Sequence, residues 1–382
     1  MHYREIGKTG VKVSALGFGA MRLPTIDDKY DRINEKEAIS MIRTALDKGV
    51  NYLDTAYGYH GGTSEDLCGK ALKDGYREKA YIATKMPSWE VKSYDDLHRL
   101  LDEQLTRLDV EYIDFYLLHT LTKAYWDIYK AIDYKKFIKE AMDMGKIKHI
   151  GFSFHDNLEL FKEITDDYDW EFCQIQLNYL DETYQAGLEG MRYAAERDMG
   201  VIIMEPLRGG MLAREEIPQE LQAIWDKSPV KRRPVQWGLS YLFDHPEVSL
   251  VLSGMSTMEQ VEDNIETARE ALPGFLSGEE RDVIGRAKEF YKSRIRVNCT
   301  SCQYCMPCPA GVNIPELFWG YNHDGVFGDF KKGQFWTTGF LKPHARAYNC
   351  IECGACETKC PQNIEIIKHL KKITELYGRG EE

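Results

Sequence analysis

Short apolar runs alternate with amphipathic segments along the first 275 residues of the chain. Between the runs, apolar residues recur at helical spacing, as at Ala38, Ile42 and Ala45. Strands that alternate with helices predict a parallel sheet covered on both faces. Eight runs have the length of a strand, and they are Val13–Leu16, Tyr52–Ala56, Ala80–Thr84, Ile113–Leu118, Ile150–Phe154, Cys173–Leu177, Val201–Met204 and Ser249–Leu252.

Eight strand–helix units within about 250 residues are typical of a (β/α)8 barrel. An open, doubly wound sheet is the alternative, but no Gly-x-Gly-x-x-Gly follows a strand as in its dinucleotide-binding form. Ahead of the first unit, Gly7 to Gly10 lie between two extended stretches and predict a β-hairpin. We therefore predict an α/β fold, with a TIM barrel over residues 1–275, a helical connector over 276–297 and a second domain over 298–382.

The charge balance narrows the classes of partner. The chain has 49 Lys and Arg against 61 Asp and Glu, a formal net charge of −12. An acidic excess argues against nucleic acid or an anionic membrane as a partner. No apolar run is long enough to span a bilayer, and the stretch from Met1 to Lys12 lacks the apolar core of a signal peptide. We expect a cytoplasmic protein without a nucleic-acid or membrane partner.

The ten cysteines are unevenly distributed. Cys68 and Cys173 stand alone in strand and helix patterns, where we interpret them as core residues. The other eight form two groups, Cys299 to Cys308 and Cys350 to Cys360. A disulfide framework requires an oxidising compartment, and no export signal is visible. Metal ligation in a reducing cytosol is therefore the better interpretation.

The second cysteine group has the spacing of a bacterial ferredoxin. Its intervals of two, two and three residues are followed by Pro361, whereas the last interval of the first group is two. Cysteine pairs two residues apart also occur in zinc sites, but zinc needs no such run of four with a following proline. We predict a ferredoxin-like domain with two [4Fe–4S] clusters. The resemblance implies crossed ligation, with Cys299, Cys302, Cys305 and Cys360 on one cluster and Cys350, Cys353, Cys356 and Cys308 on the other.

Polar residues close several predicted barrel strands, where the reactive groups of such barrels lie. The second strand ends near Asp54, the third at Lys85 and the fourth at His119. The stretch from Asn51 to Glu65, which reads NYLDTAYGYHGGTSE, resembles the most distinctive motif of the aldo-keto reductase family. In that family the catalytic Tyr follows an Asp by five residues, which implies Asp54 and Tyr59, and leaves Tyr57 at the wrong offset. The family's Lys and His correspond to Lys85 and His119.

This resemblance covers residues 1 to about 275, and the cysteine groups indicate the subgroup with a C-terminal ferredoxin-type 4Fe-4S domain. Reduction of a carbonyl requires a hydride at carbon and a proton at oxygen. A Tyr with an ordinary pKa near 10 is a weak acid for this purpose, and a neighbouring Lys ammonium lowers that pKa. The resemblance assigns the proton to Tyr59, its tuning to Lys85 and Asp54, and orientation of the carbonyl to His119.

The family also implies which residues bind NADP or NAD. Ser153 and Gln176, with Asn178 beside them, match the contacts to the nicotinamide amide. Met204 stands where an aromatic ring usually covers the nicotinamide. In the phosphate-binding loop, Gly254, Ser256, Gln260 and Asn264 match binding positions. Two basic residues that often hold the 2′-phosphate are replaced by Gly254 and Gln260, which leaves NADP and NAD both open.

We therefore predict an NAD(P)H-dependent oxidoreductase that reduces a small aldehyde or ketone. Nicotinamide gives two electrons as hydride, whereas a cubane cluster usually takes one. One hypothesis is that the clusters exchange electrons with the barrel through a flavin or a redox partner protein. A second is that they are structural or sense oxidation beside an independent reductase. The alternative function is a nicotinamide-binding, redox-sensing regulatory module without turnover, which the complete tetrad disfavours.

Overall fold

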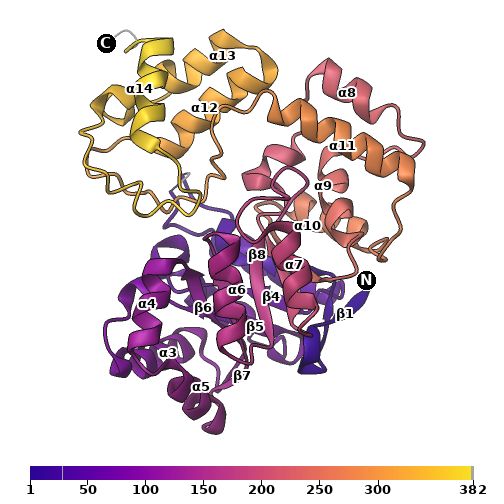
Figure 1. Cartoon of the computed structure of the whole chain (residues 1–382), viewed down its shortest axis with the longest axis vertical. Helices are drawn as coiled ribbons and strands as arrows, with labels where there is room; N and C mark the ends of the chain where they lie inside the picture. Colours follow the sequence, from indigo (N-terminus) through magenta and orange to yellow (C-terminus); the bar gives the residue numbers. More distant parts are fainter. Residues whose placement is uncertain (28, 380–382) are drawn as a thin grey trace. The chain divides into compact units, whose positions relative to one another are not determined.

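The fold is described from a computed structural model that covers residues 1–27 and 29–379. The last three residues of the predicted second domain, 380–382, lie outside the described residues. Eight parallel strands close into a barrel in the order β10-β3-β4-β5-β6-β7-β8-β9 (Figure 1), which confirms the predicted (β/α)8 architecture. These strands are β3 (Leu16–Gly19), β4 (Tyr52–Asp54), β5 (Tyr81–Met86), β6 (Ile113–Leu121), β7 (Ile147–Phe154), β8 (Phe172–Gln176), β9 (Gly200–Met204) and β10 (Val248–Gly254).

The N-terminal hairpin consists of β1 (Tyr3–Glu5) and β2 (Lys12–Ser14), which pair antiparallel around the turn at Gly7–Thr9. The apolar run predicted as the first barrel strand, Val13–Leu16, is divided between β2 and β3. Val13 belongs to the hairpin because its backbone pairs with that of Arg4, and its side chain is buried with Ile6 in the apolar cluster that fills the barrel. One uninterrupted apolar run therefore serves two different strands.

Helices on the outside of the barrel bury the apolar faces that the sequence predicts. In α3, Ser93 and Asp96 form a capping box at the N-terminus, and Leu97, Leu100 and Leu101 are buried. In α10 the N-cap Thr257 accepts a hydrogen bond from the backbone N–H of Gln260. The helices of this layer are α1 (Glu35–Asp47), α2 (Ser64–Ala71), α3 (Tyr94–Leu108), α4 (Lys123–Ala131), α5 (Tyr134–Asp143), α6 (Leu158–Asp167), α7 (Gly187–Ala195), α9 (Pro234–Phe243) and α10 (Met258–Ala268).

The chain divides into two compact units. Unit 1 comprises Met1–Leu207 and Val235–Leu276, and unit 2 comprises Arg208–Pro234 and Ser277–Glu382. The sequence places residues 208–234 in the barrel domain, whereas in the structure this segment packs within unit 2. Its α8 (Gln219–Trp225) contacts α11 (Gly278–Lys292). None of the helices in the described residues is both long enough and apolar enough to cross a membrane.

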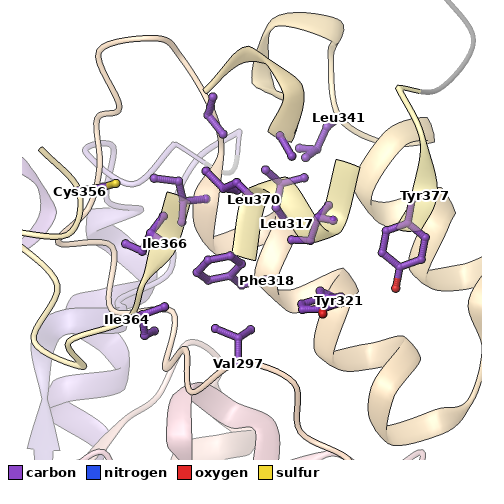
Figure 2. Packing of buried hydrophobic residues seen from close by; sticks show 14 residues of the cluster. Val297, Leu317, Phe318, Tyr321, Leu341, Cys356, Ile364, Ile366, Leu370 and Tyr377 are labelled. Atoms are coloured by element: carbon purple, nitrogen blue, oxygen red, sulfur yellow. The ribbon is translucent and has the colours of Figure 1, made fainter. Parts of the chain in front are cut away.

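Unit 2 has a small apolar core of its own. Figure 2 shows Phe318 at its centre, with Ile366 and Leu370 packed above it. Several of the cysteine side chains pack against the edge of this core, so the core and the cysteine groups form one structure. The helices that supply it are α12 (Ile314–Phe327) and α14 (Ile366–Tyr377), with the short α13 (Phe330–Gln334) and a π-helical turn, η7 (Phe335–Gly339), between them.

Candidate active site and cysteine centre

Three of the four predicted tetrad residues lie on neighbouring barrel strands. β4 pairs with β5 and β5 pairs with β6, all in parallel register. Asp54 is the last residue of β4, Lys85 the penultimate residue of β5, and His119 lies near the end of β6. Because carboxyl ends of parallel strands meet at one edge of a barrel, these side chains converge there.

Lys85 and Asp54 form a buried ion pair. Lys85 Nζ donates to Asp54 Oδ1 at 2.7 Å, to Asp54 Oδ2 at 2.8 Å and to the carbonyl of Thr55 at 2.7 Å. The three bonds use all three donors of an ammonium group. Burial lowers the pKa of Lys85 and raises the pKa of Asp54, because both charges lose hydration, and their mutual attraction opposes both shifts. The pair therefore fixes a cation inside the barrel mouth.

Tyr59 lies over this cation, and its ring centre is 5.1 Å from Lys85 Nζ. The turn that carries Tyr59 contains His60 and Gly61 at positive φ, 53° and 65°. His60 is anchored there, because its ring stacks on Tyr30 and its Nδ1 lies 2.6 Å from the carbonyl of Tyr30. The strained turn thus positions the hydroxyl-bearing ring at the mouth of the barrel.

His119 completes the group. Its ring lies edge-on to Tyr59 with 6.2 Å between ring centres, and Trp89 packs 5.2 Å away. The pKa of His119 is held well below its usual value, first by burial and then by the charge of Lys85 and the nearby His155. A neutral imidazole donates and accepts hydrogen bonds without bringing a second positive charge beside Lys85.

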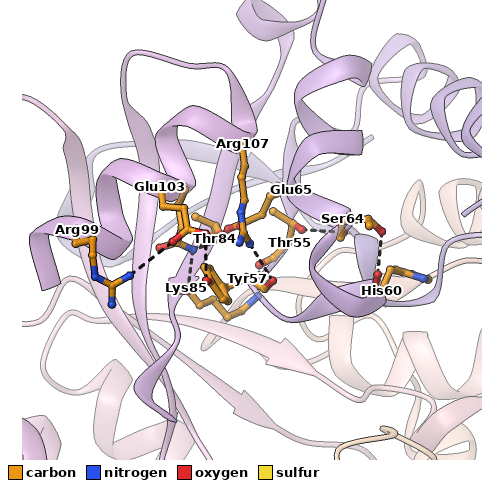
Figure 3. Close-up of polar contacts among 12 residues, drawn as sticks. Thr55, Tyr57, His60, Ser64, Glu65, Thr84, Lys85, Arg99, Glu103 and Arg107 are labelled. Carbon is orange, nitrogen blue, oxygen red and sulfur yellow. Dashed lines mark hydrogen bonds and ion pairs between the residues drawn. The ribbon is translucent and has the colours of Figure 1, made fainter. Parts of the chain in front are cut away.

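Sequence reasoning assigned no role to Glu65, which the structure places behind the tetrad. Figure 3 shows it among Thr84, Lys85 and Arg107. Its carboxylate is fully buried and accepts from Thr84 Oγ1 at 2.6 Å and from Gln104 Nε2 at 2.7 Å. The same Gln104 donates to the carbonyl of Lys85, so the network fixes the backbone that carries the cation. An acidic residue in the first turn of a helix is common, and the pattern alone gave no sign of this role.

Tyr57, the second tyrosine of the motif, makes other contacts. Its hydroxyl donates to Glu103 Oε1 at 3.1 Å, and Arg107 lies 4.0 Å above its ring. It therefore takes part in a contact with α3 and not in the pairing of Lys85 with Asp54.

The residues predicted to hold the nicotinamide close the next strands of the barrel. Ser153 is the penultimate residue of β7, and its hydroxyl accepts a hydrogen bond from the backbone N–H of Thr120 at 2.7 Å. Gln176 is the last residue of β8, and its side-chain amide donates to Asp181 at 3.3 Å. Met204 ends β9, and its sulfur accepts from Gln174 Nε2 at 3.5 Å. Gln174 Oε1 is buried without a hydrogen-bond partner within the described residues. These strand ends thus offer a buried polar set that fits an amide ligand.

The predicted phosphate loop follows β10. Ser256 N–H donates to Gln260 Oε1 at 2.8 Å, and Asn264, which is buried, donates to Ser253 Oγ at 2.9 Å. The loop packs against the backbone and side-chain stem of Arg22, a residue that sequence reasoning missed. Ser256 Oγ donates to the carbonyl of Arg22 at 2.7 Å, and a Cβ at Gly254 would stand 3.2 Å from Arg22 Cγ. Barrel closure pairs Gly254 with Gly19, which brings Arg22 to this place.

In unit 2 four of the cysteines line one cavity. Within the described residues no three His, Cys, Asp or Glu side chains converge closely enough to hold a single metal ion. The four sulfur-bearing residues around the cavity are Cys299, Cys302, Cys305 and Cys360. Burial raises the pKa of the Cys305 thiol to about 12, and the charges of Cys299, Cys360 and Cys356 add to this shift.

Cys356 is influenced by charges from both cysteine groups. Burial raises its pKa, and the charges of Glu357, Cys350 and Cys308 add to this shift. Cys353 is exposed. A ring of cysteine sulfurs around a void fits an iron–sulfur cluster, whose inorganic core occupies the space between the sulfurs. Cys68 and Cys173 are both fully buried in unit 1.

The fold and these two sites define a TIM-barrel oxidoreductase joined to an iron–sulfur domain. The chain belongs to the aldo/keto reductase family, whose sequence profile matches residues 15–273. The profile of a 4Fe-4S dicluster domain matches residues 298–365. Both findings confirm the family and the subgroup that the motifs predict.

Individual relatives agree with this assignment. L-galactose dehydrogenase of Arabidopsis thaliana is 29% identical over 293 residues, which cover 70% of this chain and 88% of that protein. The holo form of aldo-keto reductase AKR11C1 from Bacillus halodurans has a TM-score of 0.63 and 29% identity, over 75% of this chain and 96% of its own. The thermostable aldo-keto reductase Tm1743, at 24% identity and a TM-score of 0.59, supports the fold over 75% of this chain and 100% of its own.

Proposed function

We propose that this protein reduces a small aldehyde or ketone with NADPH or NADH. The observation that carries the proposal is the buried Lys85–Asp54 pair beneath the ring of Tyr59, with neutral His119 beside that ring. A fixed cation 5.1 Å from a tyrosine ring favours the phenolate over the phenol and so makes the hydroxyl a better acid.

In this mechanism a bound nicotinamide supplies the hydride. Tyr59 gives its hydroxyl proton to the carbonyl oxygen as negative charge develops there. Lys85 stabilises the tyrosinate that remains, and Asp54 keeps the ammonium in place through two hydrogen bonds. Neutral His119 donates a hydrogen bond to the same oxygen and orients it. Proton transfer of this kind typically contributes ~10²–10⁴-fold in rate.

The strand ends after the tetrad suit the dinucleotide. Ser153 and Gln176 would bind the carboxamide, and the thioether of Met204 would cover one face of the ring. Gly254, Ser256, Gln260 and Asn264 would form the phosphate loop. The side-chain stem of Arg22 lies against this loop, and its guanidinium would supply the cation that Gly254 and Gln260 lack, which favours NADPH over NADH.

Carbonyl turnover tests the proposal directly. NADPH oxidation with a panel of short aldehydes and ketones should be fast in the wild-type protein and lowered at least ~100-fold by Tyr59→Phe. Tyr57→Phe is the matched control in the same turn and should retain activity, since Tyr57 contacts Glu103 and Arg107. Nicotinamide binding without turnover of any carbonyl would contradict the proposal and favour a redox-sensing regulatory module.

We further propose two [4Fe–4S] clusters in unit 2, with the crossed ligand sets predicted from the sequence. Each cluster exchanges one electron, so coupling to a hydride donor requires a flavin or a partner protein between them. Electron paramagnetic resonance of anaerobic protein tests this coupling. If NADPH alone produces the reduced-cluster signal, electrons reach the clusters from the barrel. If only dithionite produces it, the clusters are structural, sense oxidation or receive electrons from a partner.

A further inference from the structure

The segment from Phe330 to Asn349 in unit 2 differs in charge from the rest of the chain. It contains four Lys and Arg residues and no Asp or Glu, in a protein whose net charge is −12. Asp329 stands just before it and caps α13 by accepting from the backbone N–H of Lys332 at 3.0 Å. Of the four cations, Arg346 is buried and donates to the carbonyls of Leu341 and Arg379. Lys331, Lys332 and Lys342 are exposed.

Large aromatic side chains are exposed among these lysines. Phe330 is 44% exposed, Phe335 53% and Phe340 56%. Aromatic rings with this exposure are typical of a surface that another molecule covers. We call this surface the basic aromatic face, and it consists of Phe330, Lys331, Lys332, Phe335, Phe340 and Lys342.

The aromatic rings of this face continue inward to a cluster cysteine. Trp336 contacts Phe340 at 4.5 Å and Phe335 at 5.7 Å between ring centres, and Trp319 contacts Trp336 at 4.8 Å. Trp319 and Cys299 both line a cavity of about 40 Å³. A series of packed rings therefore joins the exposed face to the cavity beside Cys299.

We propose that the basic aromatic face binds an acidic electron-carrier protein that exchanges electrons with the clusters. The proposal rests on the iron–sulfur function proposed above and identifies its partner class. In one encounter the carrier is oxidised by one electron and one cluster is reduced by one, and no atom is transferred. The exposed lysines attract the acidic carrier, and the phenylalanines provide its apolar contact. Such redox encounters use small interfaces, below about 1,200 Å².

An anionic membrane is the other surface that lysines and exposed aromatic rings can bind. One observation favours the protein carrier. The ring series from Phe340 to Trp319 leads to the cavity at Cys299, and a lipid contact has no use for it.

Stopped-flow reduction of the iron-loaded full chain by a reduced acidic flavodoxin tests the proposal, together with calorimetric binding of the same flavodoxin. Lys331→Glu/Lys332→Glu should lower the second-order rate constant about tenfold at low salt, with a smaller effect at high salt. Phe335→Ser/Phe340→Ser should weaken binding at both salt concentrations. Both variants change exposed residues and should keep their iron and their NADPH-dependent carbonyl reduction.

Lys227→Glu/Lys292→Glu is the matched control, because it makes the same change of charge at exposed positions elsewhere in unit 2. If this control slows the reaction as much as the face variant, or if neither slows it, the proposal is wrong. A second outcome would also contradict the proposal. In it, vesicles of phosphatidylcholine and phosphatidylglycerol bind the wild type and not the face variant, while flavodoxin reduces the wild type and the face variant at the same rate. A chain purified without iron would contradict the cluster proposal itself, which separates the two failures.

Discussion

Lys85 Nζ lies between the carboxylate of Asp54, which it contacts through both oxygens, and the ring of Tyr59, whose centre is 5.1 Å away. The carboxylate alone would bind the Lys85 ammonium. The carbonyl of Thr55 accepts the third hydrogen bond of that ammonium and so fixes its orientation. An ammonium placed in this way has no freedom to move toward water. Its charge therefore acts on the tyrosine hydroxyl in a dry environment, where electrostatic effects are large.

Substitution of this cation is expected to affect stability and catalysis together. Lys85→Met leaves the buried Asp54 without its partner and should lower the free energy of unfolding by about 3–5 kcal/mol. It should also lower kcat for carbonyl reduction by ~10²–10⁴-fold, because Tyr59 loses the charge that favours its phenolate. Urea unfolding and steady-state kinetics measure the two effects.

A double variant separates the two effects. Asp54→Asn/Lys85→Met removes both charges, so no unpaired ion remains and most of the lost stability should return. Activity should remain as low as in Lys85→Met. Recovery of activity with stability would show that Lys85 acts on folding and has no part in the proton transfer.

The barrel should lose stability in mild acid because of its buried histidines. Burial lowers the pKa of His155 to about 4, from an ordinary value near 6.5. Between these values the unfolded chain binds a proton that the folded chain does not, so the free energy of unfolding falls as the pH falls below about 7. His119, whose pKa is also lowered, should act in the same direction.

His155→Gln tests this linkage. The change in unfolding free energy between pH 7.5 and pH 5.5 should become smaller by about 1.3 kcal/mol, which is the share of one such histidine. His344→Gln, at an exposed position, is the control for loss of a histidine. Equal pH dependence in the wild type and His155→Gln, from urea titrations followed by tryptophan fluorescence, would contradict the prediction.

The phosphate loop is expected to decide between the two nicotinamide cofactors. Gln260→Arg adds a guanidinium next to Ser256 and should raise the ratio of kcat/KM for NADPH over NADH about tenfold, which corresponds to 1.4 kcal/mol. Arg22→Gln should change the same ratio in the opposite direction. Lys48→Gln, which removes a cation paired with Glu262 of α10, should leave it unchanged. Kinetics with both cofactors at fixed carbonyl concentration provide the measurement.

Local motifs account for the part of the site that the sequence predicts. The residues from Asp54 to Tyr59 lie in one short segment, and Lys85 and His119 each close a strand whose apolar run is plain. Arg22 lies beside Gly254 only because β3 and β10 pair where the barrel closes. A periodic pattern reports which side chains are buried and carries no information on which distant strand lies next to them. For this reason the position of Arg22 beside Gly254 could not be found from the sequence.

The boundary of the barrel shows the same limit. Residues 208–234 follow β9 in the chain and contain a helix of the expected size, so the sequence assigns them to the barrel. The structure packs α8 against α11 of unit 2, while the family profile continues through this segment to residue 273. Glu65 illustrates a second limit. Its position in the sequence is that of an ordinary acidic residue at the start of a helix, whereas in the fold its carboxylate is fully buried and accepts hydrogen bonds.

The proposed crossed ligation of two clusters gives a prediction in which two cysteines distant in sequence behave alike. Cys302→Ser and Cys360→Ser should each perturb the same cluster, because both residues line one cavity with Cys299 and Cys305. Cys308→Ser and Cys353→Ser should each perturb the other. Electron paramagnetic resonance of dithionite-reduced variants, with iron analysis, distinguishes the two spectra, and Cys173→Ser, buried in unit 1, is the control. If Cys308→Ser instead resembles Cys302→Ser, each cysteine group holds its own cluster. The cavity lined by Cys360 favours the crossed arrangement, since a cluster confined to the first group would not need a sulfur from the second.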